Sequence, residues 1–248
     1  MGGVPPALVL LHGFTQTRQS WRRTVGALGA GRYRALVPDL PGHGQATLRT
    51  PSFDAVTAYV RALAPDRFTL AGYSLGGRVA LHAALQLQPR VERLVLVGAS
   101  PGLADPAERA ARRAADDELA RRIEAIGLEA FAEEWGAQAL FAGQPPRVAA
   151  AAHADRLRNT APGLAGALRG LGTGVMEPLW DRLPELAIPV TLLTGERDAK
   201  FRAIAERMLE RLPQARHVVV PGAGHAAHLE QPEAVAYQLG SRSSSASA

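Results

Sequence analysis

Short apolar runs recur along the chain, and segments with a helical hydrophobic pattern separate them. The runs predict strands at 7–11, 33–37, 68–71, 94–97, 189–193 and 217–220. Because most of these runs are continuous rather than alternating, they are typical of strands buried on both faces of a parallel sheet. Helical patterns cover 21–28, 53–63, 75–87, 201–212 and 232–239. This alternation predicts an α/β fold, with a mostly parallel central sheet flanked by helices.

One long stretch interrupts the alternation. From Leu103 to about Leu183 there is no strand pattern, and Ala, Arg, Glu and Leu predominate between Gly and Pro positions. We interpret residues 103–183 as a helical cap, or lid, of several short helices inserted between the fourth and fifth predicted strands. Residues 1–102 and 184–240 then form the core, and the cap would cover the ligand site at the carboxyl ends of the strands. The Ser-rich segment 241–248 is expected to be a disordered tail.

The overall composition is that of one large domain or of a domain with an insertion. The chain has 248 residues, of which 47% are hydrophobic, and no apolar stretch is long enough to span a membrane. Its first residues lack the basic region and cleavage site of a signal peptide, so we expect a cytoplasmic location. There is no cysteine, which excludes disulfides, cysteine catalysis and thiolate metal sites. The composition leaves the oligomeric state open.

The positive charge of the chain is carried almost entirely by arginine. The formal net charge is +5, and Lys200 is the only lysine. A nucleic-acid partner is not expected, because the arginines alternate with acidic residues in stretches such as 107–124 and aromatic residues make up only 5%. Arginine binds carboxylates with two parallel hydrogen bonds, so some of these side chains are candidates for binding an anionic small molecule.

Ser74 is the first candidate for chemistry. It lies in the pentapeptide 72–76 (GYSLG), directly between the predicted strand 68–71 and the predicted helix 75–87. A Gly-x-Ser-x-Gly sequence in this context predicts a nucleophile elbow, a sharp turn that exposes the serine hydroxyl above the sheet. The start of the following helix also offers free N–H groups to a developing negative charge. An ordinary glycine-rich turn is the alternative, because the pentapeptide alone is common.

An acid and a histidine follow Ser74 in the order that such folds use. A serine hydroxyl needs a histidine to take its proton and an acid to orient that histidine. Asp198 follows the fifth predicted strand and His225 follows the sixth, so both lie at the carboxyl ends of strands. Each residue has its own alternative. Asp198 could instead be the N-cap of the next helix, and His225 could be a loop residue or a second N-cap. His228 is a neighbouring candidate for the base, but we prefer His225, which follows a glycine-rich segment directly after the strand.

An oxyanion hole requires two backbone N–H groups that point toward the developing charge. Leu75, the residue after the elbow, is one candidate donor, and Phe14, in the loop after the first predicted strand, is the other. We interpret His43, in the turn-rich segment 38–44, as a structural residue. The histidines do not have the spacing of a zinc motif, and no dinucleotide-binding glycine pattern follows the first strand. We therefore expect neither a metal nor a cofactor.

With these motifs, the chain resembles the α/β-hydrolase superfamily. The segments 10–14 (LLHGF) and 38–44 (PDLPGHG), the elbow and the loops of Asp198 and His225 carry the resemblance over most of the length. A narrower resemblance is to the 2-succinyl-6-hydroxy-2,4-cyclohexadiene-1-carboxylate (SHCHC) synthases of menaquinone biosynthesis. The stretches that carry it are 72–78, 101–103, 108–112, 158–174, 179–180, 195–201 and 223–228.

This resemblance implies a lyase rather than a hydrolase. SHCHC synthases eliminate pyruvate from 2-succinyl-5-enolpyruvyl-6-hydroxy-3-cyclohexene-1-carboxylate, a small molecule with three carboxylates. By resemblance, Ser74 is the base that removes a ring proton, and the oxyanion hole stabilises the charge on the succinyl carbonyl oxygen. The other positions that match substrate-binding residues of the family are Tyr73, Arg78, Arg112, Trp135 and Arg158. Gly136 is a departure, because some relatives have an aromatic residue there.

Two other functions remain as alternatives at this point. A serine carboxylesterase or a carbon–carbon bond hydrolase would use the same three side chains, with Ser74 attacking a carbonyl or activating water. A ligand-binding protein without catalysis is less consistent with the sequence, because all three candidate residues and the oxyanion loop are present. The motifs specify the fold more narrowly than the substrate.

Overall fold

A computed structural model describes residues 4–241, in which six strands form one entirely parallel sheet with the order β2-β1-β3-β4-β5-β6. The strands are β1 (Ala7–Leu11), β2 (Arg34–Leu36), β3 (Phe68–Tyr73), β4 (Val91–Val97), β5 (Val190–Gly195) and β6 (Ala215–Val220). The predicted α/β architecture is therefore confirmed, and each predicted run contains or overlaps a strand. The order reverses between β1 and β3, which is where open sheets of this kind bind ligands.

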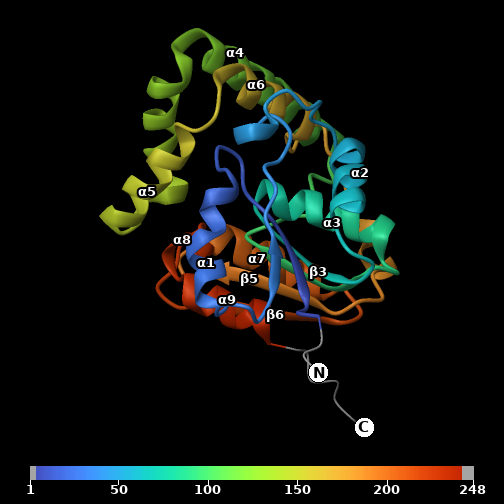
Figure 1. Ribbon diagram of the computed structural model, residues 1–248. Coiled ribbons are helices and arrows are strands. Elements are labelled where there is room, and N and C mark those ends of the chain that lie inside the picture. Colours follow the sequence, from blue (N-terminus) through green and yellow to red (C-terminus); the bar gives the residue numbers. More distant parts are fainter. Residues whose placement is uncertain (1–3, 242–248) are drawn as a thin grey trace.

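Helices cover both faces of the sheet (Figure 1). On one face the core includes side chains of α2 (Phe53–Leu63), α3 (Leu75–Leu87) and α7 (Ala199–Leu209). On the other face it includes side chains of the short helix η1 (Arg18–Trp21) and of α1 (Arg22–Ala27), α8 (Ala227–Glu230) and α9 (Pro232–Gly240). The central strands β1, β3, β4 and β5 are buried on both faces, which explains their continuous apolar sequences.

The two edge strands differ from the expectation of complete burial. All of β2 and most of β6 are at least partly exposed. Each pairs with only one neighbour, so one side of its backbone has no covering strand. The sequences reflect this position, since Arg34 and Arg216 lie inside the two strands.

The segment between β4 and β5 is helical throughout its regular parts. It contains α4 (Pro106–Gly136), η3 (Ala139–Phe141), α5 (Pro146–Arg156), α6 (Ala161–Leu171) and η4 (Trp180–Glu185). Figure 1 shows α4, α5 and α6 together at one end of the molecule, above the sheet. The 31 residues of α4 consist of two helical segments that meet at a kink at Gly127. A left-handed φ of 79° at Gly127 redirects the helix, and Phe131 then packs with Ile123 and Leu164.

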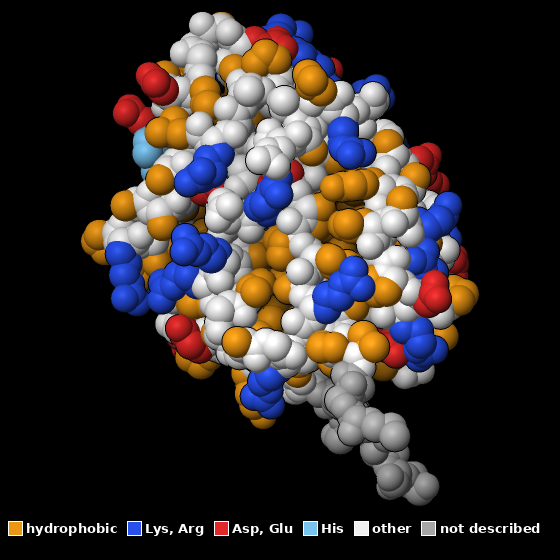
Figure 2. Space-filling model, viewed as in Figure 1, with side chains coloured by type: hydrophobic (Ala, Val, Ile, Leu, Met, Phe, Trp, Pro, Cys, Tyr) orange, Lys and Arg blue, Asp and Glu red, His pale blue; other side chains and the backbone are white. Residues whose placement is uncertain are grey.

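The charged side chains of the surface do not form a single basic patch in the view of Figure 2. On the face shown in Figure 2, Lys and Arg side chains are dispersed among apolar and acidic ones rather than gathered in one patch.

Among the described residues, no helix has the length and apolarity needed to cross a bilayer. Apart from Ser241, the tail expected to be disordered lies outside the described residues, as does the start of the N-terminal segment considered for a signal peptide. A smaller helix, η2 (Gly44–Ala46), follows β2.

Candidate active site

Ser74 occupies a strained turn between β3 and α3. Its φ is 50° and its ψ is −111°, and within residues 4–241 only Ser74 and Thr15 combine a side chain with a positive φ. The turn brings the backbone of Gly72 very close to that of Gly76: a Cβ on Gly72 would lie 2.2 Å from the Gly76 carbonyl oxygen. This geometry is that of a nucleophile elbow, and it explains why both flanking positions are glycine.

Asp198, His225 and Ser74 form a continuous hydrogen-bonded chain. His225 Nδ1 donates to Asp198 Oδ2 at 2.7 Å, and the Ser74 hydroxyl lies 3.2 Å from His225 Nε2. Asp198 thereby fixes the tautomer that leaves Nε2 free to accept a proton. The N-cap alternative for Asp198 also holds, because its other oxygen accepts from the Phe201 amide at 3.4 Å. The Asp198 carboxylate thus caps the N-terminus of α7 and also orients His225.

Two of the other buried histidines near the site, His228 and His43, have no hydrogen bond to Ser74 within residues 4–241. His228 packs between Trp21 and Tyr73, and its Nε2 donates to Gln16 Oε1 at 3.2 Å. His43 donates from Nδ1 to the Pro41 carbonyl. Burial lowers the pKa of each ring to about 3. His228 is therefore a packed neutral ring without contact to Ser74, and the structural interpretation of His43 agrees with its position.

Both residues expected to form the oxyanion hole lie at the cavity that contains Ser74. Phe14 and Leu75 both line it, and neither backbone N–H has a hydrogen-bond acceptor within residues 4–241. The Phe14 amide belongs to a tight turn that the Gln16 amide closes on the Gly13 carbonyl at 3.2 Å. Thr15, in the third position of this turn, has a φ of 66°, as a type II turn requires. The arrangement can accommodate an oxyanion between the two loops.

The cavity around Ser74 has a volume of about 330 Å³ and lies between the sheet and the cap. Two of the predicted arginines line it. Arg78, on α3, is 8% exposed and donates to the Thr173 hydroxyl. Burial, together with repulsion from Arg112, lowers the Arg78 pKa to about 10, so the guanidinium stays charged at neutral pH. Arg112 reaches the cavity from α4 and donates to Asp116 at 2.7 Å.

Of the remaining predicted positions, Trp135 lines the cavity, whereas Tyr73 and Arg158 do not. Trp135 packs edge-on against Phe14 with ring centroids 5.1 Å apart, and its buried indole N–H has no acceptor among the described residues. Tyr73 lies outside the cavity lining, and its ring packs at a tilt against the rings of His225 and His228. The Arg158 side chain is 60% exposed and lies 3.8 Å from Asp155, so it belongs to the rim of the molecule.

A third arginine, Arg156, was missed by the sequence analysis. Arg156 is 5% exposed, and no carboxylate or hydrogen-bond acceptor among the described residues pairs with its guanidinium. Arg156 does not itself line the cavity; its guanidinium lies beside Gly136, where the missing side chain leaves room, because a Cβ there would be 3.1 Å from Arg156 Nη1. Burial lowers the Arg156 pKa. The glycine at position 136, where some relatives have an aromatic residue, was visible in the sequence. It did not indicate that the side chain of Arg156 would occupy the space that this glycine leaves.

Lys200 was also missed as a site residue. The only lysine of the chain lines the cavity next to Phe201, at the start of α7. Its uniqueness in an arginine-rich chain was visible in the sequence and could have indicated a special position. Within the described part of the chain, no group of three or more His, Asp or Glu side chains is arranged to hold a metal ion.

Comparisons with known proteins agree with this geometry. A model of the alpha/beta hydrolase family matches residues 8–238. A Bacillus subtilis protein, provisionally named SHCHC synthase, is 39% identical over 91% of this chain and 86% of its own. The SHCHC synthase of Salmonella typhimurium is 38% identical over 96% of this chain and 95% of its own. The structure of MenH from S. aureus superposes with a TM-score of 0.89 at 31% identity, covering 96% of this chain and 93% of that one.

The parallel sheet, the elbow and the Ser–His–Asp chain are features of an α/β hydrolase. The close similarity to the SHCHC synthases extends through the cap, because the alignments cover nearly the whole chain. The chain therefore belongs to the alpha/beta hydrolase family and, within it, to the SHCHC synthases.

Proposed function

We propose that this protein is a carbon–oxygen lyase of menaquinone biosynthesis that eliminates pyruvate from 2-succinyl-5-enolpyruvyl-6-hydroxy-3-cyclohexene-1-carboxylate and forms SHCHC. The observation that carries the proposal is the cavity itself, where a serine–histidine pair faces two arginines, Arg78 and Arg112. A neutral ester would not need these cations, whereas a substrate with three carboxylates would. Membership in the SHCHC synthase family supports the same reaction.

In this proposal Ser74 is a base and not a nucleophile. His225 Nε2 accepts the Ser74 hydroxyl proton while the serine oxygen removes a ring proton next to the succinyl carbonyl. The electron pair of the broken C–H bond moves toward the carbonyl oxygen, where the N–H groups of Phe14 and Leu75 stabilise the negative charge. Return of these electrons forms a double bond between C2 and C3 of the ring, shifts the C3–C4 double bond to C4–C5, and breaks the bond between C5 and the oxygen of the enolpyruvyl group. The leaving group becomes pyruvate when it gains a proton.

The arginines bind the carboxylates of the substrate. Arg78 is buried beside Ser74, so a carboxylate there meets a cation that is already desolvated and positioned. Arg112 is half-exposed and lies at the cap side of the cavity. We assign the third position to Arg156 instead of Arg158, because Arg156 is buried without a partner among the described residues and Arg158 is on the surface. Trp135 and Tyr73 then shape the site around the reacting groups.

The cap and the location in the cell belong to the same proposal. Residues 103–183 act as a lid that excludes water from the substrate, and residues 1–102 and 184–240 act as the core that holds Ser74, Asp198 and His225. Exclusion of water would protect an enolate-like intermediate from wrong protonation. We expect the enzyme in the cytoplasm, and cell fractionation tests this expectation.

The decisive test is a coupled assay for pyruvate release from the freshly prepared pathway intermediate. Wild-type protein should release pyruvate, and Ser74→Ala should be slower by several orders of magnitude, since removal of a triad member has such an effect elsewhere. A wild-type protein that binds the intermediate but releases no pyruvate would contradict the proposal.

A serine carboxylesterase is the second candidate, because the 3.2 Å contact between Ser74 and His225 equally suits attack on a carbonyl. An esterase would show a burst with an activated ester and accumulate an acyl-enzyme on Ser74. The lyase should instead show no burst, while a serine-directed phosphonate could still label Ser74. A burst together with absent pyruvate release would favour the esterase.

A further inference from the structure

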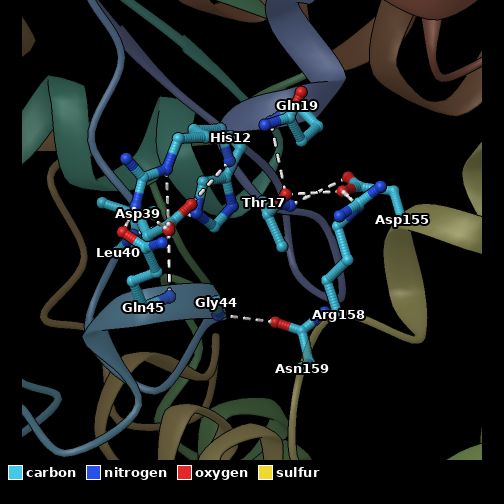
Figure 3. Close-up of polar contacts among 11 residues, drawn as sticks. His12, Thr17, Gln19, Asp39, Leu40, Gly44, Gln45, Asp155, Arg158 and Asn159 are labelled. Atoms are coloured by element: carbon cyan, nitrogen blue, oxygen red, sulfur yellow. Dashed lines mark hydrogen bonds and ion pairs between the residues drawn. The ribbon is translucent and has the colours of Figure 1, made fainter.

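The cap is joined to the core by a buried polar network around Asn159, the residue between α5 and α6 (Figure 3). Asn159 is 5% exposed, and its amide group is fully engaged. Its Oδ1 accepts from the Gly44 amide at 3.0 Å, and its Nδ2 donates to the Thr15 carbonyl at 2.8 Å and to the Arg156 carbonyl at 3.0 Å. One cap side chain thus holds two core loops that are far apart in the sequence.

The Thr15 carbonyl belongs to the loop that presents the Phe14 amide to the cavity. Thr15 is a β-branched residue with a φ of 66°, a conformation that such residues strongly disfavour. Strained residues persist only where their surroundings hold them. The described residues contain one other case of a non-glycine positive φ, at Ser74. The two strained residues therefore adjoin the two proposed oxyanion donors: Thr15 follows Phe14, and Ser74 precedes Leu75.

Contacts from the cap, from the core and within the loop itself fix the rest of the loop. Asp155, on α5, accepts from the Thr17 amide at 2.9 Å and from the Thr17 hydroxyl. The Gln16 side chain accepts from the Gly13 amide at 3.2 Å. From Gly13 to Arg18, only the amides of Phe14 and Thr15 lack an acceptor within residues 4–241. The loop is thus anchored at most of its polar groups, and the amide of Phe14, a residue that lines the cavity, remains available.

We propose that Asn159 is a positioning residue that couples the cap to the oxyanion hole. When α5 and α6 are seated on the core, the Asn159 amide holds the Thr15 peptide in its strained conformation and so keeps the Phe14 N–H directed at the cavity. Loss of this contact lets the turn relax and misdirects the donor. The inference rests on the proposed function in one respect, that Phe14 stabilises an oxyanion during the reaction of Ser74.

Asn159→Asp is the sharpest variant, because it keeps the shape of the side chain. One carboxylate oxygen can still accept from the Gly44 amide, whereas the other faces the Thr15 carbonyl as a second acceptor. Asn159→Ala is the companion variant that removes both contacts. The matched control is Thr47→Val. It removes a neighbouring hydrogen bond between core and cap, the 2.8 Å contact between the hydroxyls of Thr47 and Thr160. It leaves the contacts of the Phe14 loop unchanged.

Two rates are measured on each variant: steady-state pyruvate release, and the second-order phosphonylation of Ser74, which needs the oxyanion hole but not the natural substrate. We expect Asn159→Asp to lower kcat by about tenfold to a hundredfold, with KM changed by less than about threefold, because misplacement of one donor affects the transition state more than binding. The phosphonylation rate should fall by a similar factor. Thr47→Val should change both rates by less than about twofold.

A double-mutant cycle with Thr15→Gly separates positioning from general stability. Glycine adopts a positive φ without strain, so the loop should depend less on Asn159, and the effect of Asn159→Asp should shrink by at least about threefold in the Thr15→Gly background. A purely structural role would give the same effect in both backgrounds and would overturn the inference. So would an Asn159→Asp protein that is phosphonylated at the wild-type rate. Wild-type protein that is phosphonylated but releases no pyruvate would refute the proposed substrate and leave the coupling to be judged by phosphonylation alone.

Discussion

Replacement of Arg156 with methionine should make the protein more stable and less active. The Arg156 Nε is buried without a hydrogen-bond acceptor among the described residues, and an unsatisfied buried polar group costs about 1–3 kcal/mol. Methionine keeps a similar length of apolar chain and loses the cation–π contact to Phe141, 5.4 Å away, a contribution of about 0.5–1 kcal/mol. The free energy of unfolding should therefore rise by about 1–2 kcal/mol, which raises Tm by about 2–8 °C for a chain of this size.

Activity should change in the opposite direction. A hydrogen bond to a charged group contributes about 1.5–3 kcal/mol, so kcat/KM for the pathway intermediate should fall by about tenfold to a hundredfold. The assays are thermal unfolding without substrate and coupled pyruvate release. An increase in stability with a loss of activity is typical of a side chain kept for function.

Arg158→Met is the control from two positions further along the chain. The Arg158 side chain is 60% exposed, and an exposed ion pair such as its 3.8 Å contact with Asp155 contributes at most about 1 kcal/mol. Both stability and activity of this variant should stay near wild type. If Arg158→Met lost activity and Arg156→Met did not, the assignment of the third arginine would be wrong.

Arg78→Ala should sharply lower pyruvate release and spare hydrolysis of a small neutral ester; equal losses on both substrates would show that Arg78 is structural. Asp198→Asn should lower kcat by about 10⁴-fold, because the amide would hold its histidine partner in the wrong tautomer, and a loss below tenfold in the same assay would contradict this role. Because Lys200 is the only lysine, amine acylation followed by mass spectrometry should show several-fold protection by bound intermediate, with the α-amino group as internal reference; unchanged labelling would exclude contact. Burial lowers the pKa of His43 and of His228 from 6.5 to about 3. Between these two pH values the unfolded chain therefore binds more protons than the folded chain. Urea titrations should show that each histidine reduces the free energy of unfolding by up to about 1.4 kcal/mol per unit as pH falls below 6.5. His228→Phe should make this dependence less steep, and an unchanged slope would argue against the contribution of that ring.

Much of the fold followed from local patterns. The predicted ranges 7–11, 53–63 and 75–87 coincide with β1, α2 and α3, because apolar runs and amphipathic periods depend on neighbouring residues alone. The elbow was equally local, since two glycines around Ser74 allow a backbone approach that no other residue permits. The position of Asp198 and His225 after strands was enough to predict that they meet Ser74, because the carboxyl ends of parallel strands share one edge.

The arginines of the cap show where local reasoning fails. Arg156 and Arg158 are two residues apart at the end of α5, and nothing in their neighbours distinguishes the buried side chain from the exposed one. The difference arises where Gly136 of α4 leaves space for one guanidinium. Gly127 is one of the glycines that interrupt the helical pattern of the cap, but the pattern did not determine the geometry there, because glycine is compatible with either a helix end or a change of direction.

The sequence by itself thus determined the parallel α/β core, the elbow and the order of Ser74, Asp198 and His225, because turn chemistry and hydrophobic periodicity act over a few residues. Only the tertiary structure decided which arginine is buried and how Asn159 reaches Thr15, a contact across 144 positions of the chain. Such contacts depend on how whole helices pack, and packing is set by the combined shape of many distant side chains.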